Sequence, residues 1–198
     1  MYPEILIKNS RIYSQKILGM MNDIPIAELS DDDFKLSISE LKTRIPELEN
    51  NLKMISDFIK VIWRRKEIRI YVLPFRAHNT TFSDPLTISL CTSNGKRMDN
   101  ENLIYLITHE LIHNALEEIK VRKGITELKK DFPTLENDSY SHILVYAIQN
   151  KLFRKINKEY LCENEIEKRK NHKSTQEAWK IVREKGFENI ISNYILEM

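Results

Sequence analysis

The amino-acid sequence predicts a helix-rich α+β protein. Apolar residues recur at helical spacing over most of the chain, which predicts helices at about 34–42, 46–64, 101–121, 139–160 and 174–194. Apolar and polar residues instead alternate at 68–72, which indicates a half-buried strand, and at 86–90, which indicates a second strand. Only 4 glycines and 6 prolines interrupt the 198 residues, as is typical of a helical chain with few elaborate turns. Helices, then a small sheet, then further helices make an α+β arrangement.

Local signals set the expected ends of these elements. Helix N-caps are expected at Ser30, at Asp99, at Asp138 or Ser139, and at Ser174 with Glu177 as a capping box. Pro46 suits the first turn of its helix, and Gly124 lies where a C-terminal glycine would follow a helix. Pro74 ends the first strand, and Asn94–Gly95 predicts a turn after the second.

The order of these elements suggests three regions. We expect an N-terminal helical region at residues 1–66, a catalytic core at 67–160 and a C-terminal helical extension at 161–198. A chain of 198 residues fits one core with a helical extension.

Composition excludes several classes of function. The 31 basic and 29 acidic residues leave a net charge of +2, which argues against a protein that binds nucleic acid by neutralising phosphates. No apolar run reaches about 18 residues and the N-terminus lacks a signal-peptide pattern, so neither a membrane span nor secretion is expected. Cys91 and Cys162 lie far apart and form no disulfide framework. We therefore expect a cytoplasmic protein.

Two histidines and a glutamate form the most informative pattern. Residues 109–113 read HELIH. On a helix, His109 and His113 lie on one face, one turn apart, so that both imidazoles can bind one zinc ion. Glu110 lies beside them. Zinc lowers the pKa of a bound water to about 7, and a nearby carboxylate can then accept its proton.

The residues around this pattern favour a metal over a chance match. Apolar side chains precede and follow it: Leu103, Ile104, Leu106, Ile107, Leu111, Ile112, Ala115 and Leu116. Chance matches to so short a pattern usually fall on exposed, charged helices. In a buried helix, two histidines and a glutamate without a partner would be destabilising, and a metal ion offsets that penalty. The alternative is that the two histidines are simply packed in the core and bind no metal. A metal assay distinguishes the two interpretations.

The segment from Ile107 to Asn114 resembles the active-site helix of the zincin metallopeptidases. The resemblance covers about 15 residues and the order of the strands before the helix. It implies a zincin-like fold, with a small sheet packed on the active-site helix. It also implies that His109 and His113 are zinc ligands and that Glu110 is the general base. Zincins bind extended substrates along an edge strand, for which residues 86–90 are the candidate. Leu116 and Ile119 stand where metzincins have glycine and histidine, so that class is excluded.

A third protein ligand would leave the fourth zinc position open for water. The candidates lie between Glu136 and His142. His142 is favoured because it falls in the first turn of a predicted helix with apolar residues behind it. Glu136 is the next candidate, followed by Asp138.

Two further residues have both a functional and a structural interpretation. Tyr146 lies one turn after His142 and could donate a hydrogen bond to the oxyanion of a tetrahedral intermediate, or could simply pack as a half-buried aromatic residue. Glu117 lies one turn after His113 and could orient its ring, although an ordinary solvated glutamate is preferred. His78 and His172 lie in polar segments and are expected at the surface.

The sequence thus predicts a metallohydrolase with one Zn²⁺ per chain. The expected substrate is a peptide or protein, and this part of the prediction rests on the resemblance to zincins. The alternative is a zincin-like binding or regulatory protein without catalysis. A closed site with four protein ligands would favour that alternative, whereas the presence of Glu110 favours an enzyme.

Overall fold

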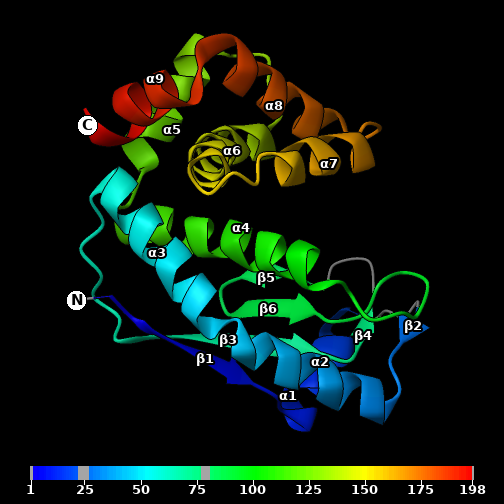
Figure 1. Ribbon diagram of the computed structural model, residues 1–198. Helices are drawn as coiled ribbons and strands as arrows, with labels where there is room; N and C mark the ends of the chain where they lie inside the picture. The colour runs from blue at the N-terminus through cyan, green and yellow to red at the C-terminus, as the bar shows by residue number, and fades with distance from the viewer. Residues whose placement is uncertain (1, 22–26, 77–80, 198) are drawn as a thin grey trace. The chain divides into compact units, whose positions relative to one another are not determined.

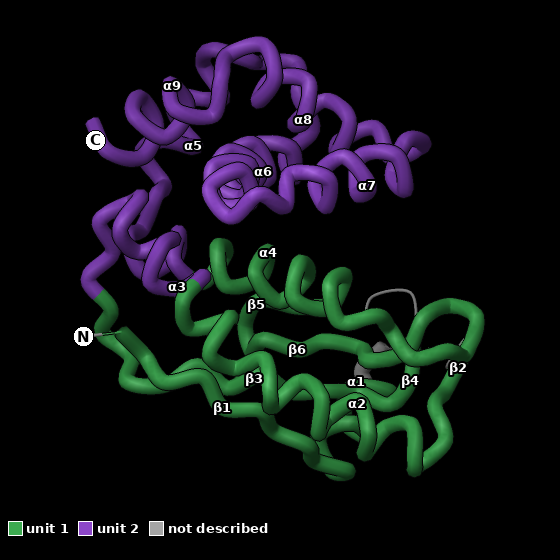
Figure 2. Tube along the Cα trace, in the orientation of Figure 1, with its two compact units in different colours: residues 1–50, 63–114 green, residues 51–62, 115–198 purple. Residues whose placement is uncertain are grey.

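The computed structural model describes residues 2–21, 27–76 and 81–197, and the chain divides into two compact units. Unit 1 comprises residues 1–50 and 63–114, and unit 2 comprises residues 51–62 and 115–198 (Figure 2). These bounds differ from the three regions expected from the sequence. Residues 4–8 pair with residues 67–71, so segments that are distant in sequence share one sheet.

A four-stranded mixed sheet forms the centre of unit 1 (Figure 1). Its strands lie in the order β1 (Glu4–Lys8), β3 (Glu67–Leu73), β6 (Leu86–Ser89) and β5 (Phe82–Ser83). The first three are parallel, and β5 is antiparallel to β6. A separate two-stranded sheet joins β2 (Ala27–Glu28) to β4 (Phe75–Arg76). The coarse α+β class is confirmed. Residues 1–66, expected to be a helical region, contain the strands β1 and β2 beside their helices.

The two predicted strands are confirmed, but they differ in burial. In β3, Ile68, Ile70 and Val72 are buried and Arg69 is exposed, as the alternation predicts. All four residues of β6 are buried instead. Its polar side chains are hydrogen-bonded: Ser89 donates to the Phe75 carbonyl at 2.7 Å, and the Tyr13 and Thr87 hydroxyls lie 2.6 Å apart. Hydroxyls whose hydrogen bonds are satisfied are tolerated in a core, so β6 is buried on both faces despite its alternating sequence.

Helices α1 (Arg11–Met21), α2 (Asp31–Thr43) and the first part of α3 (Ile45–Ile59) complete the N-terminal half of unit 1. The Ser30 cap is confirmed, since its hydroxyl accepts a hydrogen bond from the Asp33 N–H at 3.2 Å. The α3 helix ends before the expected Arg64. Lys60 turns the chain with a φ of 56°, and Ile62, which falls within the predicted helix, is 85% exposed.

Helix α4 (Asn100–Glu118) carries the histidine pattern, and its residues up to Asn114 belong to unit 1. Asp99 caps it as predicted, accepting from the Asn102 N–H at 2.9 Å. Gly124 does not end it. Lys120 adopts a φ of 51° there, and the Val121 N–H donates to the Leu116 carbonyl at 3.3 Å. Gly124 lies inside the next helix, α5 (Arg122–Asp131).

Unit 2 is helical, and α6 (Asn137–Lys155) contacts four of its neighbours. These are α5, α7 (Tyr160–Lys168), α8 (Lys173–Lys185) and α9 (Phe187–Ile191), which a π-helical turn, η1 (Ser192–Leu196), follows. Two predicted N-caps are wrong. Glu136 precedes α6 without a side-chain capping bond, and His172 occupies the N-cap position of α8. Ser174 is already helical and contacts His172, so no capping box forms.

Candidate metal centre

Helix α4 presents the predicted pattern as expected, on a largely buried helix. Ile107, Leu111 and Ile112 are fully buried, so the apolar face of the helix is in the core of the protein. Glu110 is 8% exposed, and the two histidines are half-buried. Both rings therefore remain within reach of a small ligand, while the carboxylate beside them is shielded from bulk water.

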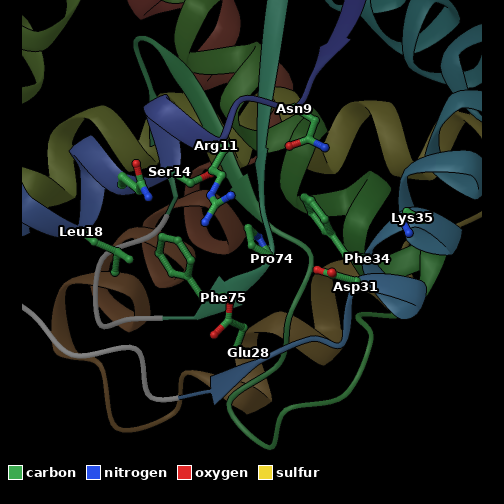
Figure 3. Close-up of a pocket in the computed structure, with 11 residues that line it drawn as sticks. Asn9, Arg11, Ser14, Leu18, Glu28, Asp31, Phe34, Lys35, Pro74 and Phe75 are labelled. Carbon is green, nitrogen blue, oxygen red and sulfur yellow. The ribbon is translucent and has the colours of Figure 1, made fainter.

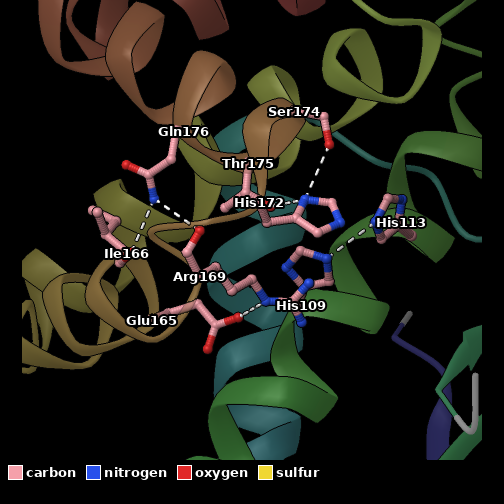
Figure 4. A network of polar contacts seen from close by, with 9 residues as sticks. All are labelled: His109, His113, Glu165, Ile166, Arg169, His172, Ser174, Thr175 and Gln176. Atoms are coloured by element: carbon pink, nitrogen blue, oxygen red, sulfur yellow. Dashed lines mark hydrogen bonds and ion pairs between the residues drawn. The ribbon is translucent and has the colours of Figure 1, made fainter. Parts of the chain in front are cut away.

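The two imidazoles of α4 are already spaced for one ion. The Nε2 atoms of His109 and His113 lie 3.3 Å apart, and their ring planes meet at 65° (Figure 4). Two nitrogens bound tetrahedrally at about 2.0–2.1 Å from a zinc ion are separated by about 3.3–3.4 Å. The helix backbone thus supplies this spacing, because residues four apart lie one above the other.

Asn114 was not singled out from the sequence, and it fastens this part of α4 to the sheet. Its amide nitrogen donates to the Ser83 carbonyl of β5 at 2.7 Å and to the Glu110 carbonyl at 3.0 Å. Its amide oxygen accepts from Arg65 at 2.6 Å. Asn114 is 1% exposed. The sequence signal that could have identified Asn114 is its polar side chain among apolar neighbours, directly after His113.

His142 lies on α6, in unit 2, in the first turns of the helix as predicted. Its Nδ1 atom lies 2.7 Å from the Asp138 carbonyl oxygen, so Nδ1–H donates there and the acceptor lone pair of the neutral ring is on Nε2. Burial lowers the pKa of His142, the Asp138 carbonyl opposes this shift, and positive Arg169 adds to it. The neutral imidazole, which is the form that binds metals, is therefore favoured.

The other candidate ligands of the same segment are exposed. Glu136 is paired with Lys173, whose Nζ lies 3.6 Å from its carboxylate. Asp138 is exposed in the first turn of α6. An exposed carboxylate would lose its hydration on binding a metal, whereas the half-buried imidazole of His142 is already partly removed from water. His142 is therefore the stronger candidate ligand within this segment.

Tyr146 has a clear packing role. It is 2% exposed, and its ring stacks on Trp179 of α8 with centroids 4.4 Å apart and planes at 11°. The ring centroid of His142 lies 5.5 Å from that of Tyr146. A hydroxyl role in catalysis stays a prediction. Glu117 is exposed, as the preferred interpretation expected.

His172 is exposed, as expected, and it helps to start α8. Its Nδ1 atom lies 3.2 Å from the Ser174 hydroxyl and 3.1 Å from that of Thr175 (Figure 4). His78, the other histidine expected at the surface, lies outside the described residues.

The predicted edge strand is wrong, because β6 lies between β3 and β5. The open side is on β3. The Lys66 carbonyl accepts a hydrogen bond from the Glu4 N–H of β1, and the Leu73 carbonyl accepts one from the Leu90 N–H. The main-chain groups of even-numbered residues in β3 therefore point towards β1, and those of odd-numbered residues point towards β6. Pairing with β6 begins only at Tyr71. Glu67 and Arg69 therefore direct main-chain groups into a pocket of about 460 Å³, which Asn114 also lines.

No protein-family model, curated protein or solved structure matches this chain. Among the described residues, no helix has the length and apolarity needed to cross a membrane. Cys91 and Cys162 are buried and are not joined in a disulfide.

Proposed function

We propose that this protein is a zinc metallopeptidase of the zincin type, with His109, His113 and His142 as metal ligands and Glu110 as the general base. The observation that carries the proposal is the 3.3 Å separation of the His109 and His113 Nε2 atoms on a buried helix, beside a buried carboxylate. A third imidazole, His142 on α6, donates from Nδ1 to the Asp138 carbonyl, so the lone pair of the neutral ring is on Nε2.

The grouping of donor atoms supports a shared ion. Within α4, the 3.3 Å separation of the His109 and His113 Nε2 atoms matches two ligands of one coordination sphere, and His142 is proposed to complete the set. Three neutral imidazoles suit zinc best among the common divalent ions. Three protein ligands would leave one position for water or substrate, as catalytic zinc sites require.

The chain's own residues then divide the chemistry. A bound zinc would supply Lewis-acid activation of water and of the scissile carbonyl. Glu110, 8% exposed, would accept the proton of the attacking water and deliver it to the leaving amine. Its position directly after His109 brings the carboxylate close to the metal. The hydrogen bond from Asn114 to the Glu110 carbonyl holds the backbone of this turn in place.

We further propose that substrate binds as an extended strand along the open side of β3. Glu67 and Arg69 offer main-chain donors and acceptors there, and an added strand would satisfy them. In the Glu110→Gln variant, addition of a peptide should shift the amide NMR signals of Glu67 and Arg69. Unchanged signals at saturating peptide would place the substrate elsewhere. Because Cys91 and Cys162 are not joined in a disulfide, we also propose a cytoplasmic location.

Elemental analysis combined with a peptidase assay tests the function. We expect about one zinc per chain in wild type and in Glu110→Gln, and loss of zinc in His113→Ala. Peptide cleavage should disappear in Glu110→Gln although the metal stays. The His172→Ala variant is the matched control, because it removes an exposed histidine that has no proposed metal role. No zinc in wild type purified without chelators would overturn the proposal. Zinc without cleavage of any peptide would favour a binding protein.

A further inference from the structure

Unit 1 contains a second cavity, of about 550 Å³, that the proposed reaction does not use (Figure 3). It is lined by residues from the start of α1, from β2, from the start of α2 and from the end of β3 into β4. A volume of this size is ordinary for a small-molecule site. None of the proposed metal ligands lines it.

Apolar side chains form one part of the cavity wall. Phe75 is 2% exposed and Phe34 is 9% exposed, and Leu18 and Pro74 lie beside them in the lining. Phe75 also belongs to a small core cluster with Ile17 and Leu73, so its ring is held in place by packing. This part of the wall would take an apolar group.

Arg11 provides a positive charge at the cavity, where its guanidinium points inward (Figure 3). Within the described part of the chain its side chain has no ion pair or hydrogen bond. Arg11 is also the first residue of α1, whose first turn holds no acidic side chain. The positive end of the helix dipole is therefore uncompensated by a carboxylate and adds to the charge of Arg11. A carboxylate is the matching ligand group.

Two carboxylates provide the opposite charge. Glu28 and Asp31 line the cavity, and Figure 3 shows both side chains directed into it. Neither makes an ion pair or a hydrogen bond through its side chain within the described residues. Lys35, the other cation of the lining, has its Nζ 3.7 Å from Asp32 instead. Like charges at one cavity repel each other, and an ammonium group would relieve this repulsion.

We propose that this cavity binds a zwitterion with an apolar side chain, that is, a free α-amino acid or a short peptide with both termini unblocked. Arg11 receives the carboxylate, Glu28 and Asp31 receive the ammonium group, and the side chain packs on Phe34 and Phe75. Charges of both signs, without a partner among the residues that the structure describes, surround buried aromatic rings. This combination distinguishes the ligand class from a simple anion, a simple cation or an uncharged apolar compound.

Isothermal titration calorimetry with phenylalanine and with the dipeptide Phe-Phe tests the proposal. The protein used is full-length Glu110→Gln, so that no cleavage adds heat. We expect saturable binding of at least one of the two ligands, and the stronger one identifies amino acid or peptide as the source. Blocking either terminus, by N-acetylation or C-amidation, should weaken binding about tenfold or more, because each removes one charge-assisted contact.

Variants locate the site. Arg11→Gln should weaken binding about tenfold, and the double variant Glu28→Gln with Asp31→Asn should do the same. Lys16→Gln is the matched control, since it removes a charge on the exposed side of α1 outside the lining. Thermal unfolding of every variant confirms folding. The proposal fails if neither ligand binds, if blocked ligands bind equally well, or if Arg11→Gln and Lys16→Gln bind alike. Adding zinc or a chelator should leave these results unchanged, which separates them from the proposed catalysis.

Discussion

The Nδ1 atom of His142 lies 2.7 Å from the carbonyl oxygen of Asp138, one turn earlier in α6. A histidine that donates from Nδ1 to a fixed carbonyl has its ring orientation set and its Nε2 lone pair exposed. Metal-binding histidines commonly have such a partner on their second nitrogen. The helix itself provides the partner here, so the orientation of His142 does not depend on a neighbouring side chain.

His142→Ala should therefore reduce zinc affinity on the order of 100-fold, at least as much as the loss of an outer hydrogen-bond partner does in other zinc sites. Glu136→Gln should leave the affinity nearly unchanged, because Glu136 is exposed and paired with Lys173. Competition with a chromogenic chelator measures both. The reverse order of effects would make Glu136 the third ligand, and equal, small effects would remove both from the site.

Asn114→Leu should destabilise the protein by about 1–3 kcal/mol, because the Arg65 side chain and the Ser83 carbonyl each lose a buried partner. Urea unfolding of the zinc-free protein measures this directly. Asn114→Asp keeps an acceptor for Arg65 but loses both donors, so we expect a smaller loss than in Asn114→Leu. A neutral Asn114→Leu would show that these bonds do not hold α4 to the sheet.

Tyr146→Ala should destabilise unit 2 by about 3–5 kcal/mol, since a fully buried ring stacked on Trp179 is removed. Tyr146→Phe keeps the ring, and we expect its stability and its kcat to stay within a few-fold of wild type. Chemical unfolding and steady-state kinetics provide the two measurements. A fall in kcat of about 100-fold in Tyr146→Phe would instead assign the hydroxyl to the oxyanion.

Glu40 should make the stability of unit 1 depend on pH. The hydrogen bond from Arg97 holds the pKa of the Glu40 carboxyl below its ordinary value, and burial opposes this shift. A carboxyl with a lower pKa in the folded state stabilises the fold above its unfolded pKa, and this contribution is lost as pH falls through the folded pKa. Glu40→Gln should thus be less stable than wild type at neutral pH, with the difference vanishing in acid. Urea titrations across this range measure it, and a constant difference would contradict the assignment.

Lys120→Gly should stabilise the protein by about 1 kcal/mol, because Lys120 ends α4 in a left-handed conformation that glycine adopts without strain. Lys123→Gly, inside α5, is the control and should destabilise by about 1 kcal/mol. Thermal unfolding of the two variants measures the contrast. Destabilisation by both would show that the Lys120 side chain contributes more than its backbone strain removes.

By itself, the sequence determined the features that depend on near neighbours. Ser30 and Asp99 cap their helices as predicted, since a capping bond spans only two or three residues. Helix geometry places His109 and His113 on one face of α4, one turn apart, so the candidate metal pair could be predicted from the sequence. The predictions that Gly124 ends α4 and that Ser174 caps α8 were wrong for a similar local reason. The end of α4 at Lys120 and the beginning of α8 at His172 do not use the residue types that are most common at those positions.

Tertiary structure decided everything that depends on pairing between distant segments. The pairing of β1 with β3 joins residues separated by three helices and one strand, and no local pattern encodes it. The full burial of β6 and the partners of Asn114 likewise depend on which segments meet, and so do the open side of β3 and the charges gathered around Phe34 and Phe75. Short-range hydrogen bonds depend on residues that are neighbours in the sequence. Burial, and the grouping of charged side chains at one site, arise only when the folded chain brings remote residues together.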